Sequence, residues 1–256
     1  MTVHIELFEY PTKEEMLALL KDSPLNKINI DEGLFRREGL NPIEQLDYSI
    51  TIGEILSLYQ NRIFQANLSY AYVMSYFNRG IPDDEWFRSN ATGGVKYYPD
   101  FKSENWTNKI HFEYHIDVFF QKAFTALDIF GHLLFKYFDL IQEKKHGRLQ
   151  DITFNNAFWN LKNQRKDISL HKKIGKIKFS NRYKEVSKIR NAIIHSQPPY
   201  VVHNRFETDE GVTTTRIHYT PSRELVKDMC DLSKFIQRIV EVFAKHIIEK
   251  YKGIGR

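Results

Sequence analysis

Three polar residues near position 190 have side chains that can act on a phosphate. Arg190, Asn191 and His195 lie close together in the run RNAIIH. A guanidinium can hold a phosphate through two parallel hydrogen bonds and can stabilise the negative charge that grows on it during a reaction. A histidine can give or take a proton near neutral pH. This combination suits phosphoryl transfer on a nucleic acid such as RNA.

A short helix is the element that must position these residues. The helical pattern over about 181–196 stops before the proline pair that begins at Pro198, because proline disfavours helical geometry in the residue before it. At about 100° per residue, Asn191 and His195 lie one turn apart on the polar face. Arg190 falls on the apolar stripe instead. We expect its stem to reach outward to solvent or its charge to meet an anion across an interface.

Positive charge is concentrated before and within this helix. Between residues 162 and 190 there are eleven Lys and Arg against two acidic residues, a net charge of +9, whereas the whole chain carries +5. Such a field attracts a polyanion, although charged runs are also common in solvated loops. We predict a basic linker before the helix. The residues that we expect to contact RNA are Lys172, Lys173, Lys176, Lys178, Arg182, Lys184 and Lys188.

Two further pairs of residues lie one turn apart on the longest predicted helix. Asp128 and His132 support the proton-transfer group if they face the helix of His195, or they form an ordinary hydrogen-bonded pair. His111 and His115 have a spacing that suits zinc, but there is no HExxH pattern and no obvious third ligand. We therefore predict that the protein uses no metal and no cofactor.

The rest of the chain alternates helical patterns with turn-rich stretches. Thr12 with Glu15, and Thr51 with Glu54, form capping boxes that predict helix starts. β-Branched and aromatic residues on both sides of ETDEG predict a β-hairpin over 200–219. The helices that we expect cover about 12–22, 51–78, 108–143, 151–165, 181–196 and 222–251.

These elements predict an all-α fold, an up-and-down helical bundle with the hairpin inserted before the last helix. Residues 49–256 would form the bundle, and residues 1–48 an N-terminal extension with a short helix packed on it. The hairpin is basic and aromatic, which suits stacking on unpaired bases, covering the bundle or pairing across a dimer. Its residues of this kind are Tyr200, His203, Arg205, Arg216, His218 and Tyr219.

Composition favours a folded protein of the reducing cytoplasm. Apolar residues make up 42% of the chain, and the single cysteine, Cys230, excludes an intrachain disulfide. Charged and polar residues interrupt the most apolar stretch, 116–141, so we predict a core helix and no membrane span. The N-terminus lacks the pattern of a secretory signal.

The motif resembles the R-x4-6-H signature of the HEPN superfamily, here Arg190, Asn191 and His195. The resemblance extends over about 50–250 and is greatest to stand-alone bacterial members with a hairpin before the last helix. It implies a homodimer in which two copies of the motif form one composite site. Active members of the family are metal-independent endoribonucleases, in which the ribose 2′-hydroxyl attacks the adjacent phosphate and leaves a 2′,3′-cyclic phosphate.

The resemblance implies that Arg190 binds the scissile phosphate of RNA, that His195 transfers the proton and that Asn191 positions it. Many members of the family are toxins or act in phage defence, often beside a nucleotidyltransferase-like antitoxin. Two other functions stay open for this chain. It could be a HEPN module that binds RNA or a partner protein without cutting, or a purely structural dimerisation domain.

Overall fold

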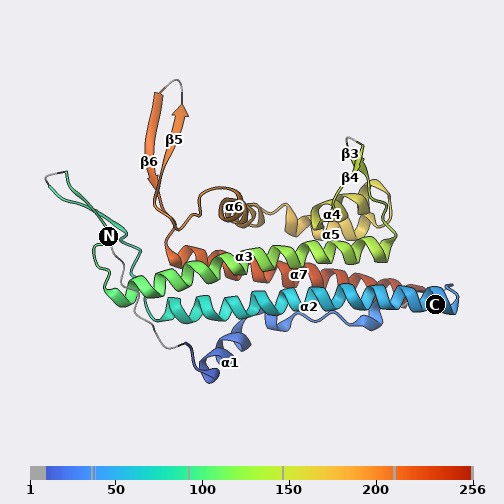
Figure 1. Cartoon of the computed structure of the whole chain (residues 1–256). Coiled ribbons are helices and arrows are strands. Elements are labelled where there is room, and N and C mark those ends of the chain that lie inside the picture. Colours follow the sequence, from blue (N-terminus) through green and yellow to red (C-terminus); the bar gives the residue numbers. More distant parts are fainter. Residues whose placement is uncertain are drawn as a thin grey trace. The chain divides into compact units, whose positions relative to one another are not determined.

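The computed structural model describes residues 10–35, 37, 39–91, 93–145, 147–209 and 212–254. Helices dominate this part of the chain, and its strands form only short two-stranded hairpins, so the predicted all-α class is confirmed (Figure 1). The helices are α1 (Lys13–Asp22), α2 (Pro42–Asn78), α3 (Ser103–Phe138), α4 (Phe154–Asn163), α5 (Ile168–Lys178), α6 (Asn181–His195) and α7 (Ser222–Ile254). The hairpins are β1–β2 (Phe87–Ser89, Val95–Tyr97), β3–β4 (Lys144–Lys145, Arg148–Leu149) and β5–β6 (His203–Asp209, Val212–His218).

The chain divides into two compact units, and each unit is built from three separate stretches of sequence. Unit 1 comprises Met1–Ser23, Asn67–Gln121 and Glu185–Asp231. Unit 2 comprises Pro24–Ala66, Lys122–Lys184 and Leu232–Arg256. The long helices α2, α3 and α7 each contribute one segment to both units. The predicted boundary between residues 48 and 49 falls inside α2, and the division of the chain there stays a prediction.

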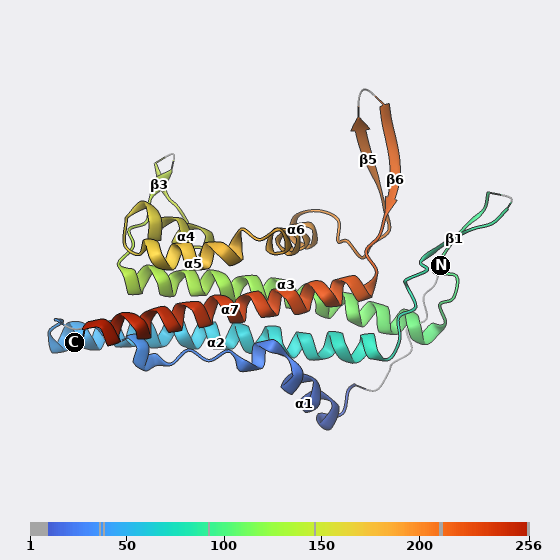
Figure 2. The ribbon, with the colours of Figure 1, turned by 180° about the vertical axis from the view of Figure 1, so that it is seen from behind.

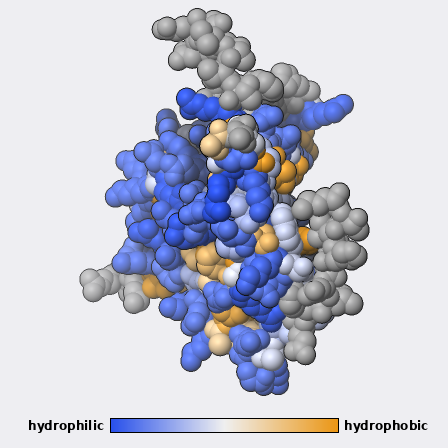
Figure 3. Space-filling model, turned by 90° about the vertical axis from the view of Figure 1, so that its left-hand side faces the viewer, coloured by the Kyte–Doolittle hydropathy of each residue, from blue (hydrophilic) through white to orange (hydrophobic). Residues whose placement is uncertain are grey.

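In unit 1, segments of α2, α3 and α7 lie side by side in both ribbon views (Figures 1 and 2). Tyr76, Phe112 and Phe119 are almost fully buried between them. Figures 1 and 2 both show α6 end-on while the long helices run across the view, so α6 crosses them at a steep angle. The face in Figure 3 is mostly hydrophilic, with hydrophobic residues gathered in small groups.

A buried aspartate joins the last hairpin of unit 1 to the start of α7. Oδ2 of Asp83 accepts hydrogen bonds from the backbone N–H of Ser222 at 2.9 Å, from the Ser222 hydroxyl at 2.7 Å and from the Tyr219 hydroxyl at 2.5 Å. Asp83 is only 1% exposed. Because a buried carboxylate needs such donors, these bonds fix the end of β6 and the first turn of α7 together.

In unit 2, α4 and α5 pack with segments of α2, α3 and α7 around a core of aromatic side chains. The ring of Phe130 contacts those of Tyr59, Phe154 and Phe243, with centroids 5.2–6.2 Å apart. Gly131 permits a close approach of α3 to the start of α4, since a Cβ atom there would lie 2.6 Å from the nitrogen of Phe154. Oδ1 of Asp128 accepts that same N–H at 3.1 Å.

Asp167 connects α5 to α7 within unit 2. Its carboxylate accepts the N–H of Leu170 at 2.8 Å, which caps α5, and lies 2.8 Å from Nε2 of His246 and 3.5 Å from Nζ of Lys250. Burial alone would raise the pKa of Asp167, but the bonds from Leu170 and His246 and the charge of Lys250 hold it below its ordinary value. The ionised carboxylate therefore stabilises the fold.

Some predicted helix boundaries are confirmed, and others are wrong. Thr12 and Glu15 form the expected capping box at the start of α1. The predicted start at Thr51 is wrong, because α2 begins nine residues earlier, at Pro42. Asn41 caps it, accepting from the N–H of Glu44 at 2.9 Å, and the Glu44 carboxylate accepts the N–H of Asn41 at 3.0 Å.

Two other expectations also need correction. The predicted basic linker is wrong, because residues 168–178 form the helix α5, capped by Asp167. The hairpin over 200–219 is confirmed as β5–β6, but the sequence did not indicate β1–β2 or β3–β4. The predicted helix over 108–143 is present as α3, which begins and ends five residues earlier.

Among the described helices, only α3 is long and apolar enough to cross a membrane by length and composition. Its most apolar window is 56% buried inside the structure. The core helix of a soluble protein has the same property, so α3 is by itself only weak evidence for a membrane span.

We expect Gly131→Ala to lower the free energy of unfolding by roughly 1–3 kcal/mol, because the added Cβ would overlap the backbone of residues 153 and 154. Gly53→Ala is the matched control, since its Cβ would meet only Oε1 of Glu32 at 3.6 Å and the helix would gain up to about 1 kcal/mol. Denaturant unfolding of both variants checks this. If both variants are as stable as the parent protein, α3 does not approach the start of α4 as closely as described.

We expect Asp167→Asn to cost roughly 1–3 kcal/mol at neutral pH, because it removes an ionised acceptor from a buried site. The pKa of Asp167 is lowered, so its contribution is present above the unfolded pKa of about 3.9 and is lost as the pH falls through the folded value. The difference in free energy of unfolding between Asp167→Asn and the parent protein should therefore shrink below about pH 4. Unfolding curves from neutral to acid pH measure it, with Asp100→Asn, at an exposed ion pair, as the control.

Candidate functional site

The helix α6 carries the three motif residues and separates a buried face from an exposed one. Ser180 precedes the helix and caps it, since its hydroxyl accepts the N–H of Tyr183 at 3.2 Å. Tyr183 and Val186 are buried, as the predicted apolar stripe requires. The side chains on the opposite face are exposed, and those are Lys184, Lys188, Asn191 and His195.

Arg190 lies between the two faces of α6. The residue is half-buried, with its Nε enclosed, and Nη1 donates a hydrogen bond to Oδ1 of Asn191 at 3.1 Å. Ile189 and Ile193, beside it on the stripe, are also half-buried. The side chain therefore combines an enclosed stem with a guanidinium that is oriented by its neighbour.

Asn191 contacts Arg190, which the sequence did not indicate. We expected Asn191 to position His195, and that role stays a prediction. The hydrogen bond between adjacent side chains gives Asn191 a direct means of orienting the guanidinium. Helical spacing also places Asn191 and His195 one turn apart, and both are exposed.

His195 is the last residue of α6 and stands beside a polar pocket of unit 1. The pocket has a volume of about 600 Å³ and is lined by Ala192 and Ser196 of the helix end and by His203 and His218 of the hairpin, among others. The rings of His203 and His218 lie nearly parallel, with centroids 6.0 Å apart. We call this the helix-end pocket. His195 itself does not line it, although its sequence neighbour Ser196 does.

The predicted RNA-binding lysines and arginine differ in exposure. Lys172, Lys176, Lys184 and Lys188 are exposed, and Arg182 is half-buried. Four of the seven predicted cations are thus exposed, as contact with a polyanion requires.

Lys173 and Lys178 are engaged within unit 2. Nζ of Lys173 lies 3.1 Å from Oε2 of Glu249 and 3.4 Å from Nδ1 of His246. Nζ of Lys178 lies 5.6 Å from the ring centre of Phe158 and also stands over Phe154 and Tyr183. Burial lowers the pKa of Lys178. Both ammonium groups already have internal partners, which makes them poorer candidates for RNA contact.

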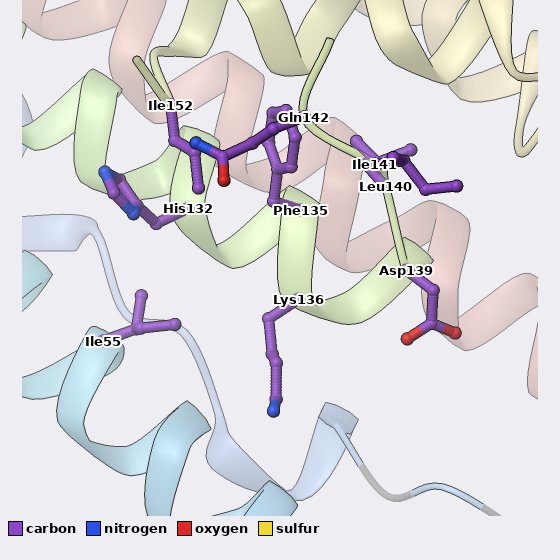
Figure 4. Close-up of a pocket in the computed structure, with 9 residues that line it drawn as sticks. All are labelled: Ile55, His132, Phe135, Lys136, Asp139, Leu140, Ile141, Gln142 and Ile152. Atoms are coloured by element: carbon purple, nitrogen blue, oxygen red, sulfur yellow. The ribbon is translucent and has the colours of Figure 1, made fainter. Parts of the chain in front are cut away.

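Asp128 and His132 belong to unit 2, whereas Arg190, Asn191 and His195 belong to unit 1. Asp128 holds the start of α4 through the N–H of Phe154. His132 is exposed and lines a pocket of about 510 Å³, in which it and Asp139 lie at opposite ends (Figure 4). The structure does not group this pair with the motif, and their supporting role stays a prediction.

His111 and His115 stack on tyrosines of α2. Their rings lie 4.6 Å from that of Tyr76 and 4.4 Å from that of Tyr72, respectively, in nearly parallel planes. Burial lowers the pKa of His115 to about 4, so the ring is neutral at physiological pH. In the described part of the chain, no group of three or more His, Cys, Asp or Glu side chains could hold a metal ion.

A helical bundle with an Arg and a His late on a short crossing helix is the arrangement of a HEPN domain. The chain belongs to the HEPN superfamily, and the family model that matches it over residues 56–248 is described as HEPN_Cthe2314-like HEPN. The match includes α6 and the hairpin that follows it. Comparison with curated proteins and with solved structures gave no match. Membership supports a ribonuclease or an RNA-binding module as the general class of function.

Proposed function

We propose that this protein is a metal-independent endoribonuclease whose active site is completed by a second copy of the chain. The observation that carries the proposal is the state of Arg190, a half-buried residue whose guanidinium is held by Asn191. Asn191 in turn lies one turn before the exposed His195. In this arrangement Arg190 binds the scissile phosphate and stabilises its growing charge. Asn191 orients Arg190 and lies within reach of the group that His195 protonates.

The chemistry needs two proton transfers on opposite sides of the phosphorus. One imidazole removes the proton of the 2′-hydroxyl, O2′ bonds to phosphorus and the bond from phosphorus to O5′ breaks. A second imidazole protonates the departing O5′, which leaves a 2′,3′-cyclic phosphate and a 5′-hydroxyl. Because one His195 cannot stand on both sides of an in-line displacement, the partner subunit's His195 supplies the second group.

The exposed apolar side chains of α6 support the dimer. Ile194 is 38% exposed, and Ile193 and Ile189 are half-buried on the stripe that carries Arg190. Burial of Ile194 and the accessible parts of Ile189 and Ile193 against their symmetry copies would bring two motifs together around a twofold axis. It would also remove water from around Arg190, which strengthens its interaction with a phosphate.

The biological setting is part of the same proposal. A ribonuclease of this kind fits a bacterial toxin or phage-defence protein of the cytoplasm, restrained by a nucleotidyltransferase-like partner. The support for this setting is membership of the HEPN superfamily alone.

A second candidate function is a HEPN module that binds RNA without cutting it. The exposed face of α6 favours it, because Lys184 and Lys188 precede Asn191 and His195 on that face and attract a phosphate backbone whether or not cleavage follows. RNA binding without 2′,3′-cyclic phosphate ends would support this function over the first.

Arg190→Ala and His195→Ala should each reduce RNA cleavage by at least about a hundredfold, because each removes a group that acts in the transition state. Arg190→Lys should restore only part of the rate, since an ammonium lacks the planar fork. The assay is gel analysis of RNA fragments and their end groups, with chelator present. Arg223→Ala, at an exposed ion pair with Asp84, is the control. Unchanged cleavage in both alanine variants would exclude the mechanism.

The exposed lysines should account for much of the salt dependence of RNA binding. Lys184→Gln with Lys188→Gln should lower the slope of log affinity against log salt by roughly 0.7 for each phosphate that the protein no longer neutralises. Fluorescence anisotropy with RNA that carries methylated 2′-hydroxyls measures binding without cleavage. Lys227→Gln with Lys234→Gln, at exposed positions of α7, is the matched control. Equal slopes for both double variants would show that RNA does not contact Lys184 and Lys188 of α6.

A further inference from the structure

A second pocket of unit 1 is lined by aromatic rings from β2, from α3 and from two connecting segments. It has a volume of about 590 Å³ and lies among Tyr97 of β2, Tyr98, Trp106 at the start of α3 and Tyr200 before β5. Lys109 also lines it. We call it the aromatic pocket. Pockets of this size hold a ligand as large as a nucleoside.

Tyr98 lines the aromatic pocket with its backbone in a strained conformation. Its φ of 50° lies in the left-handed region, which a bulky residue seldom adopts. The ring is held by three neighbours, with centroids 5.0 Å from Phe101, 5.1 Å from Trp106 and 5.6 Å from Tyr219. A strained residue persists only where its surroundings determine it, and such residues concentrate at ligand sites.

The charged groups of the aromatic pocket make it a poor site for a phosphate. The ammonium of Lys109, which is 4% exposed, pairs with Glu113 and donates to the carbonyl of Tyr200 at 3.3 Å. It also lies 5.4 Å from the ring centre of Tyr98. Asp117 does not line the pocket, but it accepts a hydrogen bond at 2.6 Å from the hydroxyl of Tyr200, which does. The ammonium of Lys109 is thus already neutralised, and the groups left to contact a ligand are mainly the aromatic rings.

The aromatic pocket is connected to the motif by the chain itself. In the segment that follows His195, residues Ser196, Gln197 and Pro199 line the helix-end pocket, and residues 200–204 line the aromatic pocket. The two pockets share His203 and Asn204, so they adjoin. Tyr200 lies five positions after His195, a span of at most about 18 Å. A short stretch of single strand at His195 can reach the aromatic pocket.

We infer that the aromatic pocket binds one unpaired base of the RNA that is held at Arg190 and His195. This inference rests on the proposed function, because it takes the ligand at the motif to be RNA. Stacking between aromatic side chains is a common way for proteins to hold unpaired bases. Tyr97, which is 44% exposed, supplies the accessible ring, and Tyr98 and Trp106 form the inner wall. The helix-end pocket takes the nucleotide between this base and the scissile phosphate.

The test is equilibrium binding of a short single-stranded RNA in which every 2′-hydroxyl is methylated, so that it cannot be cut. Tyr97→Ala should weaken binding by roughly five- to a hundredfold, the usual effect of losing one stacking ring. Tyr97→Phe should bind as the parent protein does, because stacking needs only the ring. Tyr114→Ala is the matched control, since Tyr114 is an exposed tyrosine of unit 1 that does not line the pocket.

A strand of methylated ribose phosphate without bases separates a base subsite from a phosphate subsite. The parent protein and Tyr97→Ala should bind this strand equally. Weaker binding of the abasic strand by Tyr97→Ala, equal binding of normal RNA by Tyr97→Ala and Tyr114→Ala, or no RNA binding by the parent protein would each overturn the inference. A protein that binds RNA through Tyr97 but never cuts it would overturn only the proposed function.

Discussion

Oδ2 of Asp83 holds together the part of unit 1 that borders both pockets. It accepts hydrogen bonds from Tyr219 at the end of the last hairpin and from Ser222 at the start of α7. The ring of Tyr219 in turn lies beside Tyr98 and under the ammonium of Lys109. One buried acceptor thus fixes a hairpin, a helix start and the wall of a pocket. Removing it would leave the Ser222 N–H and hydroxyl buried without their acceptor.

Local signals in the sequence were sufficient for elements whose ends are decided by neighbouring residues. The capping box at Thr12 and the stop before Pro198 both gave helix ends that the structure has, to within a residue. The prediction of a helix start at Thr51 was wrong because the sequence alone does not distinguish a threonine inside a helix from one at its start. Its hydroxyl donates to the carbonyl of Asp47 within α2. The true cap, Asn41, precedes a proline that suits the first helical turn.

The candidate site was predictable where it depends on one helix. Counting around α6 separates Asn191 and His195 from the buried Val186, and it places Arg190 on the apolar stripe. Which lysines are exposed was not predictable. Lys176 and Lys178 are both basic residues of α5, yet only Lys178 lies over aromatic rings. The aromatic pocket was equally hidden, since it joins Tyr98 to Tyr200 across about a hundred positions of sequence.

The interleaving of the two units constrains how the protein is made. A ribosome releases the chain from its N-terminus, but unit 1 includes residues up to Asp231, and unit 2 has its last stretch after that point. Neither unit can complete its core while most of the chain is still being translated. The motif helix emerges before β5, β6 and the start of α7, which supply the hairpin residues of both pockets. A nascent chain therefore carries the residues of the motif before it has the hairpin and the helix start that border the two pockets.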